Sequence, residues 1–200
     1  AEDAMMAAEA ADRMFASGNR LGPFHGIPFG LKDICDVEGR ITTGGSKAMQ
    51  DRVSPVTGTL AHRLFAAGGI MQAHRVPGGS SSGTATSVAA GMAVCGVGTD
   101  TGGSVRLPAG FCGLAGLKVT EKRLPTDGIL PLSHTLDTPG PLARSVEDTV
   151  LMFLAMDGVA GWSVDQDRQE GRGLFDSLRA GVKGLRLGVL DAQERAECTP

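Results

Sequence analysis

Apolar residues recur at helical spacing in several stretches of the chain. The clearest stretch is residues 59–67, where apolar side chains return every three to four positions, at Leu60, Ala61, Leu64 and Phe65. Residues 4–16, rich in Ala and Met, and the small-residue segment 84–95 predict two further helices. Another helix is expected to begin at Ser145, because Ser145 and Asp148 have the order of a capping box.

Short apolar runs between turn residues predict the strands. Residues 27–34 form one such run, with Lys32 inside it, and residues 94–99 form another. A third strand is expected at residues 185–190, whereas residues 70–77 are too short and polar to be more than a connection. Strands that alternate with helices indicate an α/β fold, and 200 residues suffice for one domain with a sizeable core.

Composition and charge narrow the classes of function. The hydrophobic fraction of 42% and the charged fraction of 20% are ordinary for a globular protein, and no apolar run reaches the length of a membrane span. The net charge is −3, with no cluster of basic residues that would attract nucleic acid or an acidic membrane surface. We therefore expect neither nucleic acid nor a membrane as a partner.

The cysteines and histidines indicate neither a disulfide framework nor a metal site. No two of the four cysteines have C-x-x-C spacing; they are Cys35, Cys95, Cys112 and Cys198. This usage predicts reduced thiols in a cytoplasmic protein. The four histidines are scattered without the spacing of metal ligands, so we expect no metal and no cofactor.

Two clusters of glycine and serine, within residues 78–83 and 102–104, carry the candidate chemistry. Glycine lets the backbone turn sharply, and neighbouring N–H groups can then converge on an anion. With a serine hydroxyl among them, such turns suit acyl transfer, which needs a nucleophile beside an oxyanion hole. Ser104 is the candidate nucleophile of the second cluster. The alternative is a plain glycine-rich turn, with Asp100 and Arg106 as a surface ion pair.

The serines of the first cluster allow several interpretations. Serines before an apolar helix are most often N-caps. A phosphate-binding loop is disfavoured, because the G-K-[ST] sequence is absent. Residues 79–83 match the G-x-S-x-G nucleophile elbow with Ser81 as nucleophile, although the polar residues before them make a poor strand. Alternatively, one of these serines relays a proton to Ser104.

Lys32 and His134 are the candidate bases. Lys32 stands beside Asp33, which favours an ion pair at the end of a strand. Its apolar neighbours would instead lower its pKa and favour the neutral amine, which can accept a proton from serine. His134 lies in a loop that equally suits substrate contact and solvent exposure.

Several segments in a fixed order make the chain similar to the amidase signature family of serine hydrolases. They are residues 22–33 (GPFHGIPFGLKD), 77–84 (PGGSSSGT), 98–106 (GTDTGGSVR), 108–118 (PAGFCGLAGLK) and 136–144 (LDTPGPLAR). The resemblance spans about residues 7–156. It implies a three-layer α/β/α fold around a mixed sheet, as a single domain over residues 1–200.

The resemblance also implies the catalytic residues. Ser104 matches the family's nucleophile, Ser80 the serine preceded by a cis peptide bond, and Lys32 the catalytic lysine. The oxyanion hole would consist of the matching amides, those of Thr101, Gly102, Gly103 and Ser104. Lys32 would take a proton from Ser80, which takes one from Ser104, and the resulting acyl-enzyme would be hydrolysed by water.

The chain departs from the family's pattern at a few points. Ser82 stands where the family usually has glycine. The interval between Lys32 and Ser80 is shorter than in the family, which predicts a missing segment near residues 71–72. Much of the family's sheet and substrate pocket comes from residues beyond the part matched here, so we expect the domain to be incomplete.

The resemblance favours an amidase that hydrolyses the carbon–nitrogen bond of a carboxylic amide or a related carbamate. Its partner would be a small-molecule amide. The sequence does not decide whether the protein forms a homodimer. One alternative is the glutaminase subunit of a tRNA-dependent amidotransferase. Another is a catalytically silent amidase-like binding protein, which the presence of Lys32, Ser80 and Ser104 disfavours.

Overall fold

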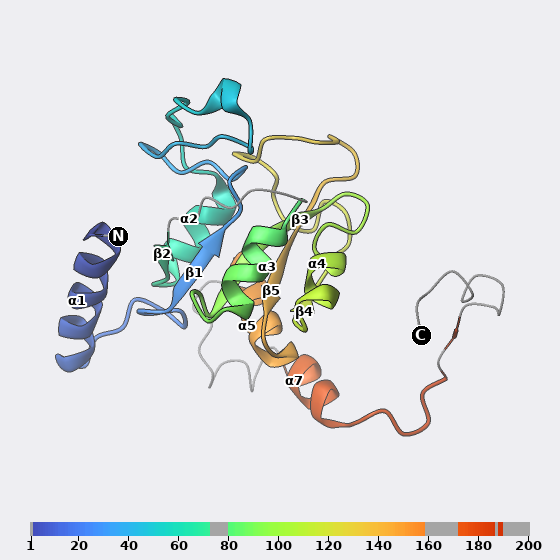
Figure 1. Cartoon of the computed structure of the whole chain (residues 1–200). Helices are drawn as coiled ribbons and strands as arrows, with labels where there is room; N and C mark the ends of the chain where they lie inside the picture. Colours follow the sequence, from blue (N-terminus) through green and yellow to red (C-terminus); the bar gives the residue numbers. More distant parts are fainter. Residues whose placement is uncertain (1, 73–79, 159–171, 187, 190–200) are drawn as a thin grey trace.

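A mixed sheet of five strands in the order β2-β1-β3-β5-β4 forms the centre of the molecule (Figure 1). The computed structural model describes residues 2–72, 80–158, 172–186 and 188–189. The strands are β1 (Pro28–Leu31), β2 (Ile70–Gln72), β3 (Cys95–Asp100), β4 (Ala115–Gly116) and β5 (Thr138–Ala143). β1 lies parallel to β2 and β3, whereas β5 runs antiparallel to β3 and β4.

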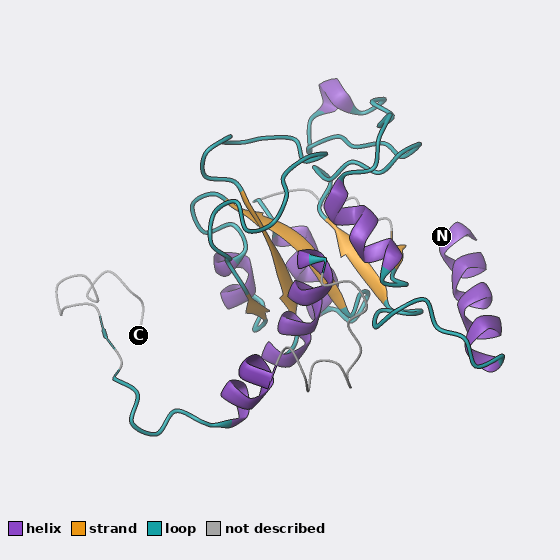
Figure 2. Ribbon diagram, turned by 180° about the vertical axis from the view of Figure 1, so that it is seen from behind, coloured by secondary structure: helices purple, strands orange, loops and turns teal. Residues whose placement is uncertain are grey.

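Helices cover both faces of the sheet (Figure 2). One face carries α3 (Ser82–Ala89) and α4 (Arg106–Phe111), and the other carries α2 (Thr59–Ala66) and α5 (Val146–Asp157), which pack together. At the edges, α1 (Glu2–Ala16) contacts β2, and α7 (Arg172–Arg179) contacts α5. The expected three-layer α/β/α arrangement around a mixed sheet is confirmed.

The main core lies between the sheet and the pair of helices α2 and α5. Phe29 of β1, Leu64 of α2, and Met152 and Met156 of α5 are fully buried there in one cluster. On the opposite face a smaller cluster joins α3, α4 and β5. All six residues of β3 are buried. The central strands therefore hold in place the residues that follow their ends.

The predicted start of α5 is confirmed. The Ser145 hydroxyl accepts a hydrogen bond from the Asp148 amide at 3.0 Å and donates one to the Asp148 carboxylate at 2.8 Å. The helix ends at Asp157, and the residue that caps it, Gly158, has a φ of +75°, the left-handed conformation that glycine adopts most easily.

Several predicted boundaries are corrected. The first strand ends at Leu31, so Lys32 follows β1 instead of lying within a strand. Residues 70–77, expected to be only a connection, begin with β2, which pairs with β1. Its three residues are too few to show the apolar pattern of a strand. The prediction of a strand at 185–190 is wrong for the described residues of that segment, which are exposed and belong to no sheet. α3 begins at Ser82 and is shorter than the helix expected at 84–95.

The sequence did not predict α4, β4 and β5. Pro139 and Pro141 disguise β5, because proline lacks the N–H that a strand usually donates, yet β5 pairs with β3 along its whole length. β4 has only two residues. In α4, Pro108 lies in the first turn, where no N–H is needed for the helix. These elements carry signals that usually mark loops.

Candidate active site

Lys32 directly follows β1, beside the last residues of the parallel strand β3. Leu31 of β1 lies opposite Val97 of β3, and the Lys32 amide donates to the Val97 carbonyl at 3.2 Å. Beyond the end of β1, Lys32 Nζ donates to Oγ1 of Thr99, a residue of β3, at 2.7 Å and to Ser80 Oγ at 2.5 Å. The fold thus joins two expected site residues that are 48 positions apart in the chain.

The surroundings of Lys32 favour its neutral amine. Burial lowers the pKa of Lys32 from 10.5 to about 8, against the opposing attraction of the Asp137 and Asp100 carboxylates. The neighbouring Asp33 points elsewhere: its carboxylate accepts hydrogen bonds from the Thr43 amide at 3.0 Å and from the Thr43 hydroxyl. Within the described ranges Lys32 has no ion-pair partner, so the strand-end ion pair considered from the sequence is not formed.

The serines of the first cluster differ in their surroundings. Ser80 is exposed and touches Lys32. Ser81 is 1% exposed, and its hydroxyl donates to the Thr99 carbonyl at 3.2 Å and accepts from the Thr99 amide at 3.1 Å. A side chain at Gly98 would meet Ser81 Oγ at 2.7 Å, so this close approach needs glycine. A hydroxyl so buried and engaged does not suit a nucleophile, which disfavours the elbow interpretation.

Asp100 organises the turn that carries Ser104. Its fully buried carboxylate accepts hydrogen bonds from the amides of Gly103 and Val105, at 2.8 and 3.2 Å. The Arg106 guanidinium donates to it through Nε and Nη2, both at 3.0 Å. Burial alone would raise the pKa of Asp100, but these hydrogen bonds hold it at about 2. The pair is a brace with one buried partner, not the surface ion pair that the sequence left open.

Ser104 lies half-buried between β3 and α4, and its hydroxyl bonds to no residue that the structure describes. Of the amides expected in the oxyanion hole, that of Gly103 donates to Asp100. Those of Thr101, Gly102 and Ser104 donate to none of the described residues. Gly103 has a φ of +123°, which only glycine adopts without strain. These three amides are therefore available to a bound oxygen.

Two features of the expected triad stay predictions. Ser80 and Ser104 are not hydrogen-bonded to each other in the described structure, so no observed contact supports the proton transfer between them. The expected cis bond joins Ser80 to Gly79, and Gly79 lies outside the described residues.

A cleft of about 500 Å³ opens beside Lys32 and Ser80. Its walls are the loop after β1, which includes the 3-10 helix Lys47–Met49, and the loop before β5; both lie beyond the same ends of β1 and β3 (Figure 1). Its apolar lining consists of Ile34, Met49, Leu130, Pro131 and Leu132. His134 is exposed and lies outside this lining.

Sequence reasoning missed two polar residues of the site. Thr99 stands within the segment 98–106 but was given no role. The signal was available, because β1 and β3 are parallel and their carboxyl ends, at Leu31 and Asp100, lie at the same edge of the sheet. Asp137 stands within the segment 136–144, and its carboxylate accepts a hydrogen bond from Thr101 Oγ1 at 2.5 Å. No local pattern would have indicated that contact.

Among the described residues, no group of three or more His, Cys, Asp and Glu is placed to hold a metal ion. Cys35 and Cys95 are buried free thiols, and burial raises the pKa of each to about 12. Both therefore stay protonated at neutral pH. Cys112 is free and half-buried, and Cys198 lies outside the described part of the chain.

The chain matches a known protein family along its length. The family model described as Amidase matches residues 1–74 and 71–200. The chain belongs to the amidase family. The two pieces matched by the amidase model meet at residues 71–74, the place where the sequence predicts a missing segment.

Relatives of this amidase-family chain have different names. It is 35% identical over 216 residues to a glutamyl-tRNA(Gln) amidotransferase subunit of Anaeromyxobacter dehalogenans, covering 94% of the chain and 44% of the relative. It is 37% identical over 215 residues to 2-amino-5-chloromuconic acid deaminase of Comamonas testosteroni, covering 93% and 44%. The chain thus spans less than half the length of these curated relatives.

Solved amidases share the fold. The native peptide amidase of Stenotrophomonas maltophilia superimposes with a TM-score of 0.70 and 30% sequence identity, over 92% of this chain and 42% of that one. In the part of the amidase-family chain that the structure describes, no helix is both long and apolar enough to cross a membrane.

Proposed function

We propose that this amidase-family chain carries the catalytic residues of a serine hydrolase that cleaves the carbon–nitrogen bond of a carboxylic amide or a related carbamate. Ser104 is the nucleophile, Ser80 the proton relay and Lys32 the base. The observation that carries this proposal is the contact of Lys32 Nζ with Ser80 Oγ at 2.5 Å, made by a lysine whose pKa is lowered to about 8. A buried lysine with a lowered pKa can activate a serine hydroxyl.

The reaction follows from these roles. The neutral amine of Lys32 takes a proton from Ser80 Oγ, which takes one from Ser104 Oγ, while Ser104 bonds to the substrate carbonyl carbon. The negative charge that develops on the carbonyl oxygen is stabilised by the amides of Thr101, Gly102 and Ser104. The proton then returns through Ser80 to the nitrogen as the carbon–nitrogen bond breaks. Water hydrolyses the acyl-enzyme by the same relay.

The cleft supports a substrate with an apolar group. Its lining includes the side chains of Ile34, Met49 and Leu130. Its two charged side chains, Lys32 and Asp33, already have hydrogen-bonding partners within the protein. Binding of an apolar group against these walls is favourable, because it removes apolar surface from water. We therefore propose a small, uncharged amide as the substrate.

The proposal is tested by amide hydrolysis with the purified full-length protein. We expect Ser104→Ala to lose measurable turnover of hexanamide and benzamide, and Lys32→Ala to lose turnover near pH 7. His134→Ala, which changes an exposed residue of the neighbouring loop, is the matched control and keeps wild-type rates. Unchanged turnover in Ser104→Ala would show that the nucleophile is wrongly assigned.

A second candidate is the glutaminase subunit of a tRNA-dependent amidotransferase. The named relative in Anaeromyxobacter dehalogenans favours it. This function predicts hydrolysis of glutamine in preference to simple apolar amides, and co-purification with partner subunits. A catalytically silent binding protein predicts instead that a fluorophosphonate probe fails to label Ser104.

The expected partner and location remain part of the proposal. A small-molecule amide is the proposed partner, and a homodimer and a cytoplasmic location stay predictions from the sequence. Light scattering of the purified protein measures the number of protomers directly.

A further inference from the structure

The carboxylate of Asp137 joins two separate loops at the site. Its Oδ1 atom accepts a hydrogen bond from Thr101 Oγ1 at 2.5 Å. Its Oδ2 atom accepts from the amides of Leu132 and Ser133, at 2.7 and 3.0 Å. Asp137 also donates its own amide to the Ser133 carbonyl at 3.0 Å. Each oxygen of this one carboxylate therefore serves a different loop.

The register of the sheet explains why these residues meet. In the antiparallel pair of β3 and β5, Asp100 lies opposite Thr138 at the last paired position. Thr101 and Asp137 are the next residues on the two chains, so their side chains lie side by side just beyond the ladder. The contact thus rests on the two central strands.

The two joined loops have distinct parts in the proposed reaction. Thr101 begins the turn that runs to Ser104 and offers amides to the oxyanion. Leu132 lines the cleft beside Lys32. We propose that Asp137 is a positioning residue, which holds the oxyanion turn against the wall of the cleft so that a substrate bound by one is aligned with the other. This inference rests on the proposed amide hydrolysis.

The ionised carboxylate is suited to this task. It offers two acceptor oxygens to three donors, whereas an amide side chain offers one acceptor and would turn its NH₂ group toward a donor. Burial opposes the charge, but the hydrogen bonds from Thr101, Ser133 and Leu132 outweigh burial and lower the pKa of Asp137. The carboxylate is therefore ionised at neutral pH without an arginine partner among the described residues.

Thr101→Val tests the bond to the oxyanion turn, since it keeps the shape of the side chain and removes the donor. An oxyanion interaction acts in the transition state, so its loss lowers kcat and kcat/KM together. We expect kcat for hexanamide to fall about tenfold or more, with KM unchanged, because losing an oxyanion donor outright costs about a hundredfold. Thr101→Ser keeps the hydroxyl and should restore kcat.

Asp137→Asn tests both bonds at once. We expect kcat to fall as in Thr101→Val and KM for hexanamide to rise, since the cleft wall at Leu132 also loses its anchor. Asp127→Asn is the matched control: the Asp127 carboxylate accepts a hydrogen bond from the Thr59 amide at 2.8 Å, but at the start of α2 and outside the lining of the cleft. It should lose a similar hydrogen bond while keeping kcat and KM.

The outcomes separate this inference from the proposed function. If the wild type is active and Ser104→Ala is not, but Thr101→Val keeps full kcat, the positioning role is wrong and the hydrolase proposal stands. Equal losses of kcat in Asp127→Asn and Asp137→Asn would also overturn the positioning role. If the wild type hydrolyses no amide at all, the proposed function itself fails. Should Asp137→Asn not fold, Thr101→Val still reports on the same contact from its other end.

Discussion

Lys32 Nζ donates a hydrogen bond to Thr99 Oγ1 at 2.7 Å, and the two residues come from the ends of neighbouring parallel strands. Thr99 is 3% exposed, and its backbone is bonded in turn to the hydroxyl of Ser81. Lys32 is thus held by the sheet through Thr99 and contacts the residues before α3 through Ser80, and all three residues line the cleft. A fixed position and a lowered pKa are what a general base needs.

Removal of the Thr99 hydroxyl tests this positioning. Thr99→Val keeps the shape of the side chain, so we expect the fold to persist. The hydroxyl oxygen accepts a hydrogen bond from Lys32 and so favours its charged form; without it the pKa of Lys32 falls below about 8. We expect kcat to fall about tenfold, as for loss of general-base positioning. The control is Thr149→Val, a buried threonine on α5.

The pH dependence of activity follows from the pKa of Lys32. The amine accepts a proton only when it is neutral, and burial lowers its pKa from 10.5 to about 8. We expect kcat/KM to rise with pH through a midpoint near 8 and to level off above it, since kcat/KM reports the pKa of the free enzyme. A profile that is flat between about pH 6 and pH 9 would argue against Lys32 as the base.

The brace between Asp100 and Arg106 contributes to stability. Asp100→Asn leaves buried donors poorly matched, and breaking such a pair should lower the free energy of unfolding by about 3 kcal/mol at pH 7. Because folding lowers the pKa of Asp100 from 3.8 to about 2, its stabilisation is present above pH 3.8 and is lost as the pH falls toward 2. Urea unfolding at several pH values should show the difference from wild type shrinking over that window.

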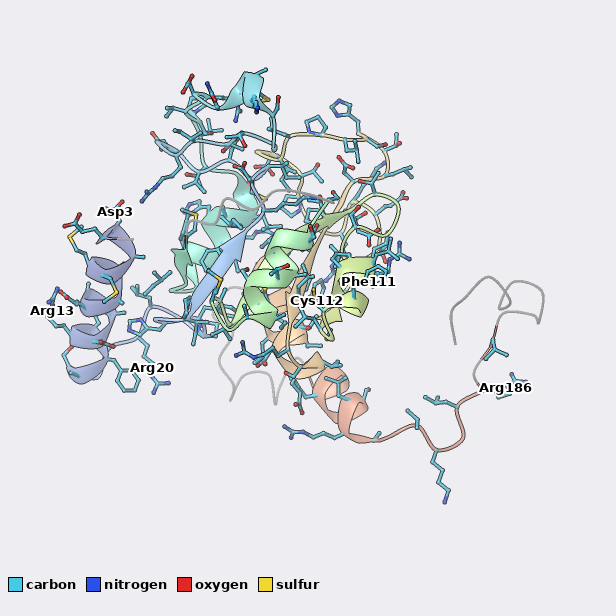
Figure 3. All side chains as sticks on the ribbon, viewed as in Figure 1. Asp3, Arg13, Arg20, Phe111, Cys112 and Arg186 are labelled. Carbon is cyan, nitrogen blue, oxygen red and sulfur yellow. The ribbon has the colours of Figure 1, made fainter. Side chains whose placement is uncertain are left out.

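A surface ion pair provides the contrast for this measurement. Arg40 pairs with Asp3, which lies near the start of α1 (Figure 3), and the side chains are 48% and 63% exposed. Arg40→Gln should change the free energy of unfolding by about 0.5 kcal/mol or less. If both substitutions had equal effects, burial of the Asp100 carboxylate would not matter to stability.

Met49 is expected to contribute to binding of apolar substrates, because it lines the cleft. Met49→Ala removes apolar contact area, and at ~0.8 kcal/mol per buried methylene we expect KM for hexanamide to rise about fivefold. Acetamide, which is too short to fill the cleft, should show little change. Met92→Ala, a 53% exposed methionine that precedes β3, is the control. A rise in KM for both amides alike would place Met49 outside the binding site.

Sequence patterns predicted the elements that have strong local signals. The amphipathic spacing of residues 59–67 and the capping residues Ser145 and Asp148 correspond to α2 and α5. β5 was missed because its two prolines indicate a loop. Its pairing with β3 outweighs this local preference of proline. β2 was missed because three residues carry too little pattern to separate a strand from a connection.

At the candidate site, residue types alone left alternative roles open for several residues, and their burial and hydrogen bonds in the structure decide between these roles. The sequence left Ser81 open as a less favoured alternative nucleophile to Ser104, and only the packing of α3 against β3 shows that the Ser81 hydroxyl is buried. Lys32 had an equally plausible partner in its neighbour Asp33, whose carboxylate bonds instead to Thr43. The contact between Asp137 and Thr101 depends on strand register, which residue spacing does not encode.

The identity of the serine that reacts with a fluorophosphonate probe tests the central claim most directly. The purified full-length protein is treated with a fluorophosphonate probe at pH 8, digested, and analysed by mass spectrometry of the labelled peptide. We predict one adduct, on Ser104, which is absent in Ser104→Ala and forms much more slowly in Lys32→Ala. An adduct on Ser80 or Ser81, or full labelling of Ser104→Ala, would contradict the assignment of Ser104 as the nucleophile.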